Sequence, residues 1–134
     1  MERKDIKTFV LIDDDPISIF ISSKIIEQKF TSRVVPFASA IEALDTLKDW
    51  GGSERDNFPV LIFLDLNMPF MDGWDFLEQF NKLPPVILDN CFVNILTSSV
   101  DSKDILKSQA FTCVQSVICK PLSKNKLEQV TDSN

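Results

Sequence analysis

Short apolar runs, each followed at once by polar or charged residues, constrain the fold of this chain most. Apolar runs of this length are typical of strands buried on both faces of a parallel sheet. Residues 33–37 form a weaker candidate, and Pro36 predicts an edge position for it. The stronger runs cover residues 9–12, 60–64, 93–96 and 117–119.

Segments with a helical spacing of apolar residues separate these runs. Capping residues open three of them: Asp15, which precedes a proline, a capping box that begins at Ser39, and Asp72. Two further helices are predicted after Asp101 and over residues 122–130. Strand-like and helical segments therefore alternate five times. This alternation predicts an α/β protein with a doubly wound, five-stranded parallel sheet.

Length and composition fit one globular unit. The chain has 134 residues, of which 44% are hydrophobic and 25% charged, so residues 1–134 are expected to form a single domain without an output domain. Residues 50–57 and 81–90 are predicted to be surface loops. No apolar stretch is long enough to cross a bilayer, and the N-terminus does not resemble a signal peptide. We therefore expect a cytoplasmic protein.

Charge and residue usage exclude several functional classes. The formal net charge of −6 argues against direct nucleic-acid binding, which needs a basic surface. The chain contains no histidine, so it cannot donate a phosphoryl group from its own phosphohistidine or use a Ser-His or Cys-His pair. Three irregularly spaced cysteines predict neither a disulfide framework nor a zinc site.

Polar residues follow the predicted strands where ligands bind in open α/β sheets, outside the carboxyl ends of the strands. Asp14 and Asp65, with a backbone carbonyl from the turn after Asp65, would form an oxygen-only site that suits Mg²⁺. Lys120 and the Thr97 hydroxyl could contact the oxygens of a phosphoryl group. Asp65, unprotonated beside the metal, is then the candidate nucleophile. The residues that the chain places at these ends are Asp13, Asp14, Asp65, Thr97 and Lys120.

The order and spacing of these residues resemble the receiver domain of two-component response regulators. The resemblance covers essentially the whole chain, and the complete set is far more specific than any one motif. It implies a sheet with strand order 2-1-3-4-5. The segments that carry it are Leu11–Pro16, Leu64–Pro69, Met71–Gly73, Ile95–Ser99 and Lys120–Leu122.

Residue roles follow from this resemblance. It makes Asp65 the phosphoacceptor, Thr97 the switch hydroxyl and Lys120 the phosphate-binding lysine. Its metal ligands for Mg²⁺ would be Asp13, Asp14, Asp65 and the backbone carbonyl of Asn67.

The implied function is a stand-alone receiver controlled by phosphorylation. A histidine kinase or histidine phosphotransfer protein would phosphorylate Asp65 in a Mg²⁺-dependent reaction and thereby change the protein-binding surface of the receiver. A phosphorelay shuttle, a phosphate sink and a direct regulator of a downstream protein all remain open. Val117 stands where the family often carries Tyr or Phe, which leaves a constitutive adaptor that works without phosphate as the alternative.

Two other functions fit the sequence less well. A Mg²⁺-dependent phosphatase with an aspartyl nucleophile often has a second Asp two residues later as general acid, but this chain has Asn67 there. The chain is therefore not expected to be an enzyme beyond catalysing its own phosphorylation and dephosphorylation. A dinucleotide-binding fold is excluded because the chain has three glycines and no Gly-x-Gly-x-x-Gly motif.

Overall fold

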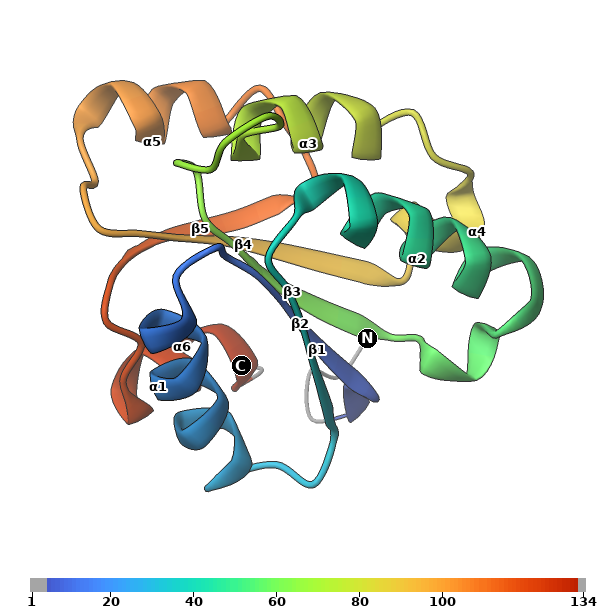
Figure 1. Ribbon diagram of the computed structural model, residues 1–134, viewed down its shortest axis with the longest axis horizontal. Helices are drawn as coiled ribbons and strands as arrows, with labels where there is room; N and C mark the ends of the chain where they lie inside the picture. Colours follow the sequence, from blue (N-terminus) through green and yellow to red (C-terminus); the bar gives the residue numbers. More distant parts are fainter. Residues whose placement is uncertain (1–4, 133–134) are drawn as a thin grey trace.

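The computed structural model describes residues 5–132, which form a five-stranded parallel sheet between two layers of helices (Figure 1). The strand order is β2-β1-β3-β4-β5, so the predicted doubly wound fold and its order are confirmed. Pro36 lies in β2 at one edge of the sheet, as predicted. The strands are β1 (Thr8–Ile12), β2 (Arg33–Phe37), β3 (Val60–Leu64), β4 (Cys91–Thr97) and β5 (Val114–Cys119).

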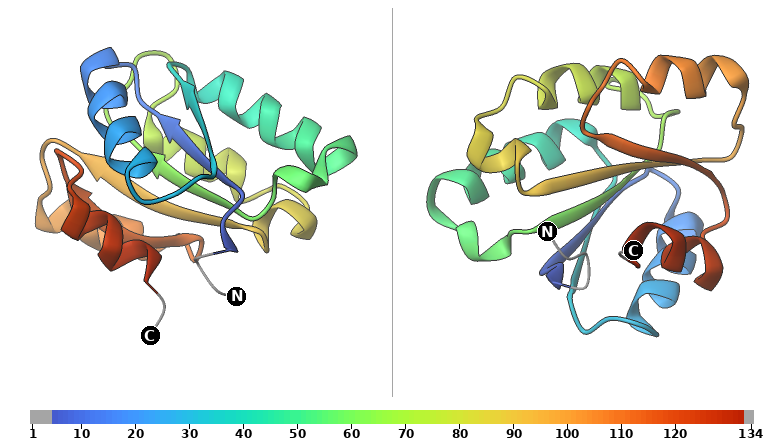
Figure 2. Two further views of the ribbon diagram at one scale, coloured as in Figure 1. Left: turned by 90° about the horizontal axis from the view of Figure 1, so that it is seen from below. Right: turned by 180° about the vertical axis from the view of Figure 1, so that it is seen from behind.

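Helices cover both faces of the sheet. Figure 2 shows α1 and α6 together on one face, while α2, α3, α4 and α5 lie on the other. No helix among the described residues is both long and apolar enough to span a membrane. The helices are α1 (Pro16–Glu27), α2 (Ala40–Ser53), α3 (Gly73–Phe80), α4 (Pro85–Leu88), α5 (Ser102–Ser108) and α6 (Lys124–Thr131), with a 3-10 turn at Arg55–Asn57.

The central strands are buried on both faces because their side chains alternate between two cores. In β1, Phe9 faces the core beneath α1 and α6, whereas Val10 faces the core beneath α2 and α3. In β3, Leu61 and Ile62 divide in the same way. A strand covered on both sides needs apolar residues at every position, which explains the unbroken runs in the sequence.

Capping groups begin the helices where the sequence predicts them. The Asp15 carboxylate accepts a hydrogen bond from the Ile17 amide at 3.0 Å. The Ser39 hydroxyl accepts one from the Glu42 amide at 3.3 Å. Asp72 closes a reciprocal capping box, and Asp101 caps α5. Each cap satisfies an amide that the first turn of a helix leaves without an intrahelical partner.

Two local predictions need correction. The predicted loop at 50–57 is wrong in its first half, because α2 continues to Ser53 and buries Trp50 against Phe58, with ring centroids 6.4 Å apart. Gly51 permits the close approach of α4, since a Cβ there would lie 2.6 Å from Ile87 Cγ1. The predicted loop at 81–90 contains that short helix.

The apolar residues that predicted α1 do form a helix, but they face solvent. Ile17 is 69% exposed and Phe20 is 63% exposed. The buried residues of α1 are Ser22 and Ile26 instead. The helical spacing therefore predicted α1 correctly, but these apolar side chains lie on the surface of the molecule and not in the core.

Candidate functional site

The sheet brings the predicted residues together because parallel strands end at the same edge. Asp65 follows β3, and its amide donates a hydrogen bond to the Ile12 carbonyl of β1 at 2.9 Å. Lys120 follows β5, and its amide donates to the Thr97 carbonyl of β4 at 2.8 Å. Four strands thus deliver their polar ends to one place.

Three carboxylates form the centre of the site. Oxygen atoms of Asp13, Asp14 and Asp65 all lie within 4.8 Å of one another. Asp13 and Asp65 are buried, whereas Asp14 is exposed. Carboxylates held this closely repel one another unless cations lie among them. Their hard oxygen donors suit a divalent cation such as Mg²⁺, so these side chains could hold a metal ion.

Lys120 supplies a cation within this group. Its Nζ lies 2.6 Å from Asp13 Oδ2 and 3.5 Å from Asp65 Oδ2. Burial alone would lower the pKa of Lys120, but the hydrogen bond and charge of Asp13, followed by those of Asp65, outweigh it and raise the pKa. The ammonium group therefore stays charged beside the carboxylates.

Burial raises the pKa of Asp65, and the negative charge of Asp13 raises it further. The charge of Lys120 and a hydrogen bond from the Asn67 amide to Asp65 Oδ1, 3.4 Å long, act in the opposite direction. A carboxylate that is costly to keep charged gains from any added cation nearby. Metal binding would thus favour the ionised form that can act as a nucleophile.

Thr97 is fully buried at the end of β4, and its hydroxyl has no hydrogen-bond partner among the described residues. A buried hydroxyl without a partner costs about 1–3 kcal/mol. A buried group of this kind calls for an explanation, and one such explanation is a role in the chemistry of the site. The next residue, Ser98, is exposed at the start of the loop to α5.

The loop after Asp65 is fixed by a glycine whose importance sequence reasoning missed. The Gly73 amide donates to the Leu66 carbonyl at 3.0 Å and closes the loop at its base. A Cβ at Gly73 would lie 2.7 Å from the Asp65 carbonyl oxygen, so only glycine fits. The Asp-Gly pair was the available signal. Asn67 lies within this loop and is exposed.

A second positioning residue, Lys126, could not have been found from the sequence. From α6, its Nζ donates to the carbonyls of Cys119 at 2.7 Å and Pro121 at 3.1 Å. These two carbonyls flank Lys120, so α6 holds the segment that carries the lysine. The contact depends on how α6 packs, for which Lys126 itself gives no pattern.

A protein-family match identifies the kind of domain that carries this site. Residues 9–132 match the family model of the response regulator receiver domain. The chain belongs to this family. Receiver domains are regulatory modules of two-component signalling, so the acidic cluster at the sheet edge lies in a domain used for signal reception.

Similar proteins support this identification. The receiver is 27% identical to the probable methanogenesis regulatory protein FilR2 of Methanothrix harundinacea over 98% of this chain and 83% of that one. A two-component response regulator of Cytophaga hutchinsonii is 28% identical, with a TM-score of 0.84 and 93% of each chain covered. The phosphorylated cyanobacterial phytochrome response regulator RcpA is 26% identical, with a TM-score of 0.69 over 93% of this chain and 88% of that one.

Proposed function

We propose that this receiver accepts a phosphoryl group on Asp65 from the phosphohistidine of a histidine kinase or histidine phosphotransfer protein, in a Mg²⁺-dependent reaction in the cytoplasm. The observation that carries the proposal is the placement of Asp65. It is buried at a strand end, beside the ammonium of Lys120 and within a cluster of three carboxylates. The similar protein RcpA has been crystallised in a phosphorylated form, which supports the same chemistry here.

The transfer forms one bond and breaks one. An Asp65 carboxylate oxygen attacks the phosphorus of the phosphohistidine, and the P–N bond breaks with its electron pair going to the imidazole, which takes up a proton. Asp13, Asp14, Asp65 and the Asn67 carbonyl would hold Mg²⁺, which would supply positive charge next to the transferred oxygens. Lys120 stabilises the negative charge on the same group. The chain thus promotes its own phosphorylation and dephosphorylation without acting on other substrates.

Thr97 connects the phosphoryl group to the rest of the molecule. A phosphoryl oxygen is a strong acceptor for the Thr97 hydroxyl, so phosphorylation gives the side chain a contact that no residue in the range 5–132 provides. Movement of Thr97 pulls on the loop that leads into α5. The expected result is a changed binding surface on α5, β5 and α6, which a downstream protein recognises.

Contacts with the Trp74 ring join α3 to α5 and to the turn that follows α5. The Trp74 ring stacks on Phe111, with centroids 6.2 Å apart, and Lys107 Nζ lies 4.6 Å from the Trp74 ring centroid. Both helices begin at loops that line the site. Val117 on β5 offers no aromatic ring, so we expect the contacts of Trp74 to transmit a shift of α5 to α3.

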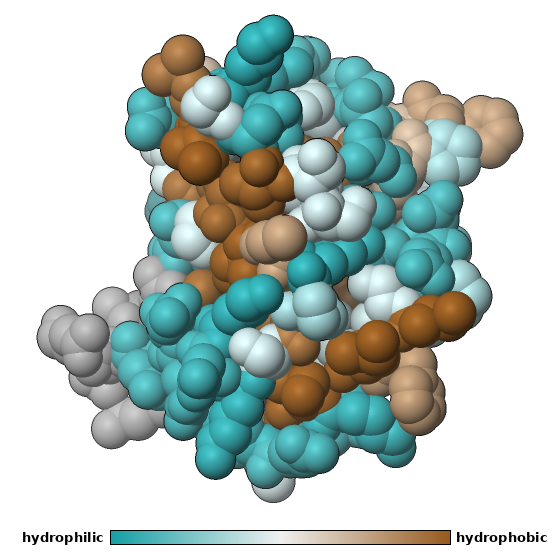
Figure 3. All heavy atoms as spheres, turned by 90° about the vertical axis from the view of Figure 1, so that its left-hand side faces the viewer, coloured by the Kyte–Doolittle hydropathy of each residue, from teal (hydrophilic) through white to brown (hydrophobic). Residues whose placement is uncertain are grey.

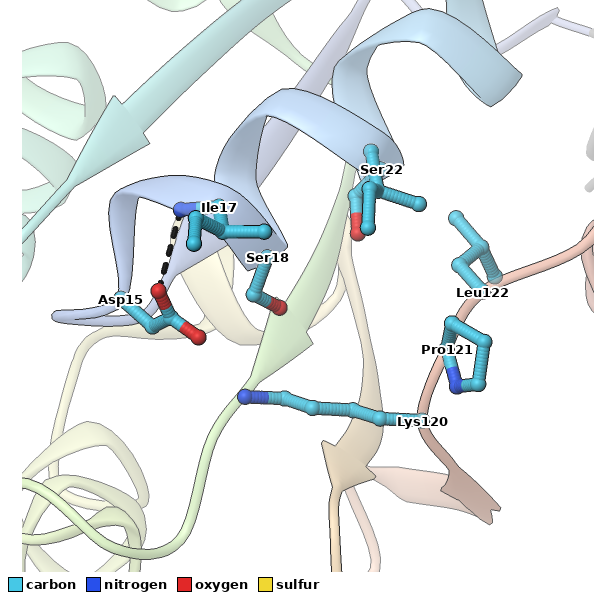
Figure 4. Close-up of a pocket in the computed structure, with 8 residues that line it drawn as sticks. Asp15, Ile17, Ser18, Ser22, Lys120, Pro121 and Leu122 are labelled. Carbon is cyan, nitrogen blue, oxygen red and sulfur yellow. Dashed lines mark hydrogen bonds between the residues drawn. The ribbon is translucent and has the colours of Figure 1, made fainter.

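We expect the protein that donates the phosphoryl group to dock beside α1. A cavity of about 220 Å³ lies between α1 and the segment after β5, with the Lys120 side chain along one wall (Figure 4). Apolar side chains of Ile17, Ile21 and Leu122 line it. A protein that brings a phosphohistidine to Asp65 would bury these side chains as it docks.

Incubation with acetyl phosphate tests the function. The wild type should gain one phosphoryl group by intact mass when Mg²⁺ is present and none when EDTA replaces it. Asp65→Asn should gain none, with a far-UV circular dichroism spectrum like that of the wild type. Labelling of Asp65→Asn would refute the assignment of the acceptor. No labelling of the folded wild type would favour the constitutive adaptor.

A further inference from the structure

Lys126 lies at a position in α6 where helix stability disfavours a cation. Ser123 caps this helix, and its hydroxyl accepts a hydrogen bond from the Lys126 amide at 3.2 Å, so Lys126 belongs to the first turn. The positive end of the helix dipole lies at this turn, where acidic side chains are favoured and cations are not. Glutamate or glutamine at this position would complete a capping box. The first turn of α6 instead has Lys124 and Lys126 and no acidic residue.

The contacts of the Lys126 side chain explain the cation. Side chains on a helix point back toward its N-terminus, so the Lys126 ammonium reaches past the start of α6 to the segment after β5. Its Nζ donates to the Cys119 carbonyl at 2.7 Å and to the Pro121 carbonyl at 3.1 Å. Hydrogen bonds from a charged donor are stronger than those between neutral groups. Lys126 therefore stabilises a segment outside its own helix.

The segment that Lys126 holds carries Lys120 between the two carbonyls. The Lys120 amide donates to the Thr97 carbonyl at 2.8 Å, which fixes the chain on the β5 side. The next residue, Pro121, has no amide hydrogen and so cannot donate a backbone hydrogen bond that would fix the chain beyond Lys120. The Lys126 ammonium supplies a donor there. One group from α6 thus holds the backbone on both sides of Lys120.

The helix that carries Lys126 is itself firmly held. Leu127 and Val130 are buried in the core beneath α1 and α6. Toward the other end of the helix, Lys29 Nζ lies 3.4 Å from Glu128 Oε2 and 3.2 Å from Asp132 Oδ1. Figure 3 looks onto the side of the molecule where α6 lies, and hydrophilic residues cover the lower left of that surface. With an apolar face in the core and a polar face in water, α6 is a fixed support for Lys126.

Precise placement matters for Lys120 because its side chain is long and flexible. Its Nζ lies 3.5 Å from Asp65 Oδ2, and its side chain is only 16% exposed. Ordering a flexible lysine during the reaction costs conformational entropy, whereas a lysine that is already in place adds no such cost to the transfer step. Holding the backbone on both sides of Lys120 restricts where its ammonium can go.

We infer that Lys126 is a positioning residue for phosphoryl transfer. By binding the carbonyls on both sides of Lys120, it keeps the Lys120 ammonium where it stabilises the charge of the transferred group. Lys126 acts through Lys120 and does not itself contact the phosphoryl group. Its loss therefore slows the transfer step and leaves binding of the phosphoryl donor unchanged. The inference rests on the proposed function, since it assumes that Asp65 is phosphorylated.

The test measures labelling by acetyl phosphate with saturating Mg²⁺, followed by intact mass over a range of acetyl phosphate concentrations. Lys126→Gln removes the ammonium and shortens the side chain, but it completes a capping box with Ser123 and so keeps α6. Lys126→Arg keeps a charged donor. Lys124→Gln is the matched control, because Lys124 is an exposed lysine of the same turn. Circular dichroism and urea unfolding check that each variant is folded under the conditions of the assay.

The expected result is a slower transfer step in one variant only. Misplacing a reacting group by about 1 Å can slow a reaction about a hundredfold, and Lys126→Gln loosens the backbone without displacing it outright, so we expect a maximal labelling rate about tenfold lower. The acetyl phosphate concentration that gives half of this rate should stay at the wild-type value. Lys126→Arg should restore most of the rate, and Lys124→Gln should match the wild type. In a Lys120→Met background, Lys126→Gln should cause no further loss, because the residue that it positions is gone.

Several results would overturn the inference while the proposed function survives. One is a wild-type rate for Lys126→Gln, and another is a loss that Lys126→Arg does not restore. A change in the half-saturating concentration alone would show that Lys126 attracts the anionic donor and does not position Lys120. An equal loss in the Lys120→Met background would show that Lys126 acts independently of Lys120. Failure of acetyl phosphate to label the folded wild type would instead refute the proposed function.

Discussion

Replacing Thr97 with valine should stabilise the unphosphorylated receiver. Thr97 is fully buried, and its hydroxyl lacks a partner among the described residues. Valine has nearly the same shape but no group that must be desolvated, so the substitution removes a penalty of about 1–3 kcal/mol. We expect the free energy of unfolding to rise by about 1 kcal/mol, allowing for imperfect packing of the new methyl group. For a domain of this size, the corresponding increase in Tm is about 3–5 °C.

Thr8 provides a matched control at the other end of the sheet. It is also buried in a strand, and its hydroxyl likewise has no partner in the described part of the chain. Urea unfolding followed by circular dichroism, without Mg²⁺ or a phosphodonor, should show a similar gain for Thr8→Val and Thr97→Val. Only Thr97→Val should lose the conformational response to phosphorylation, monitored by Trp74 fluorescence in a Trp50→Phe background. Destabilisation by Thr97→Val together with stabilisation by Thr8→Val would refute the reasoning.

Three further substitutions test the site and its surroundings. Gly73→Ala should lower the unfolding free energy by about 1–3 kcal/mol in urea denaturation, because its Cβ would clash with the Asp65 carbonyl; Gly52→Ala, with open space around its Cβ, should not destabilise. Lys120 has a pKa raised above its ordinary 10.5, so its stabilising contribution is complete below pH 10.5 and is lost as the pH rises through the folded-state value. Without Mg²⁺, Lys120→Met should therefore show a smaller loss of stability than wild type in unfolding titrations above pH 10.5; equal losses would contradict this coupling. Lys107→Met removes the ammonium above the α3 tryptophan, a contact of about 0.5–1 kcal/mol, and should change the emission of that tryptophan without abolishing labelling by acetyl phosphate.

Residue type and strand position were sufficient to predict most of the fold. Strands β1 and β3 are enclosed by helices, so apart from Thr8 at the start of β1 their sequences contain no polar residue that could conceal the pattern. The same logic located Asp65 and Lys120, since a charged residue directly after a buried strand must emerge at the edge of the sheet. The grouping of these residues follows from topology. Their roles in phosphoryl transfer remain predictions until labelling is measured.

Features that depend on tertiary contacts could not be predicted. The spacing of Ile17 and Phe20 indicates a helix but does not say which side α6 and the sheet cover. The sequence predicts a loop at Trp50 and Gly51, but α2 continues through both residues, where it contacts Phe58 and α4. The backbone φ of +69° at Phe70 has no sequence signal, because phenylalanine does not normally adopt a positive φ.

The two edges of the sheet differ in how well they are protected against unwanted pairing. Pro36 removes one backbone donor from β2, and a strand with fewer donors is a poor template for another chain. At the opposite edge, β5 contains neither proline nor lysine and is only partly covered along its length. Additional strands would therefore add at β5 rather than at β2. Aggregation of partly unfolded receiver should begin there, and a lysine introduced at the exposed Gln115 would be the simplest means of slowing it.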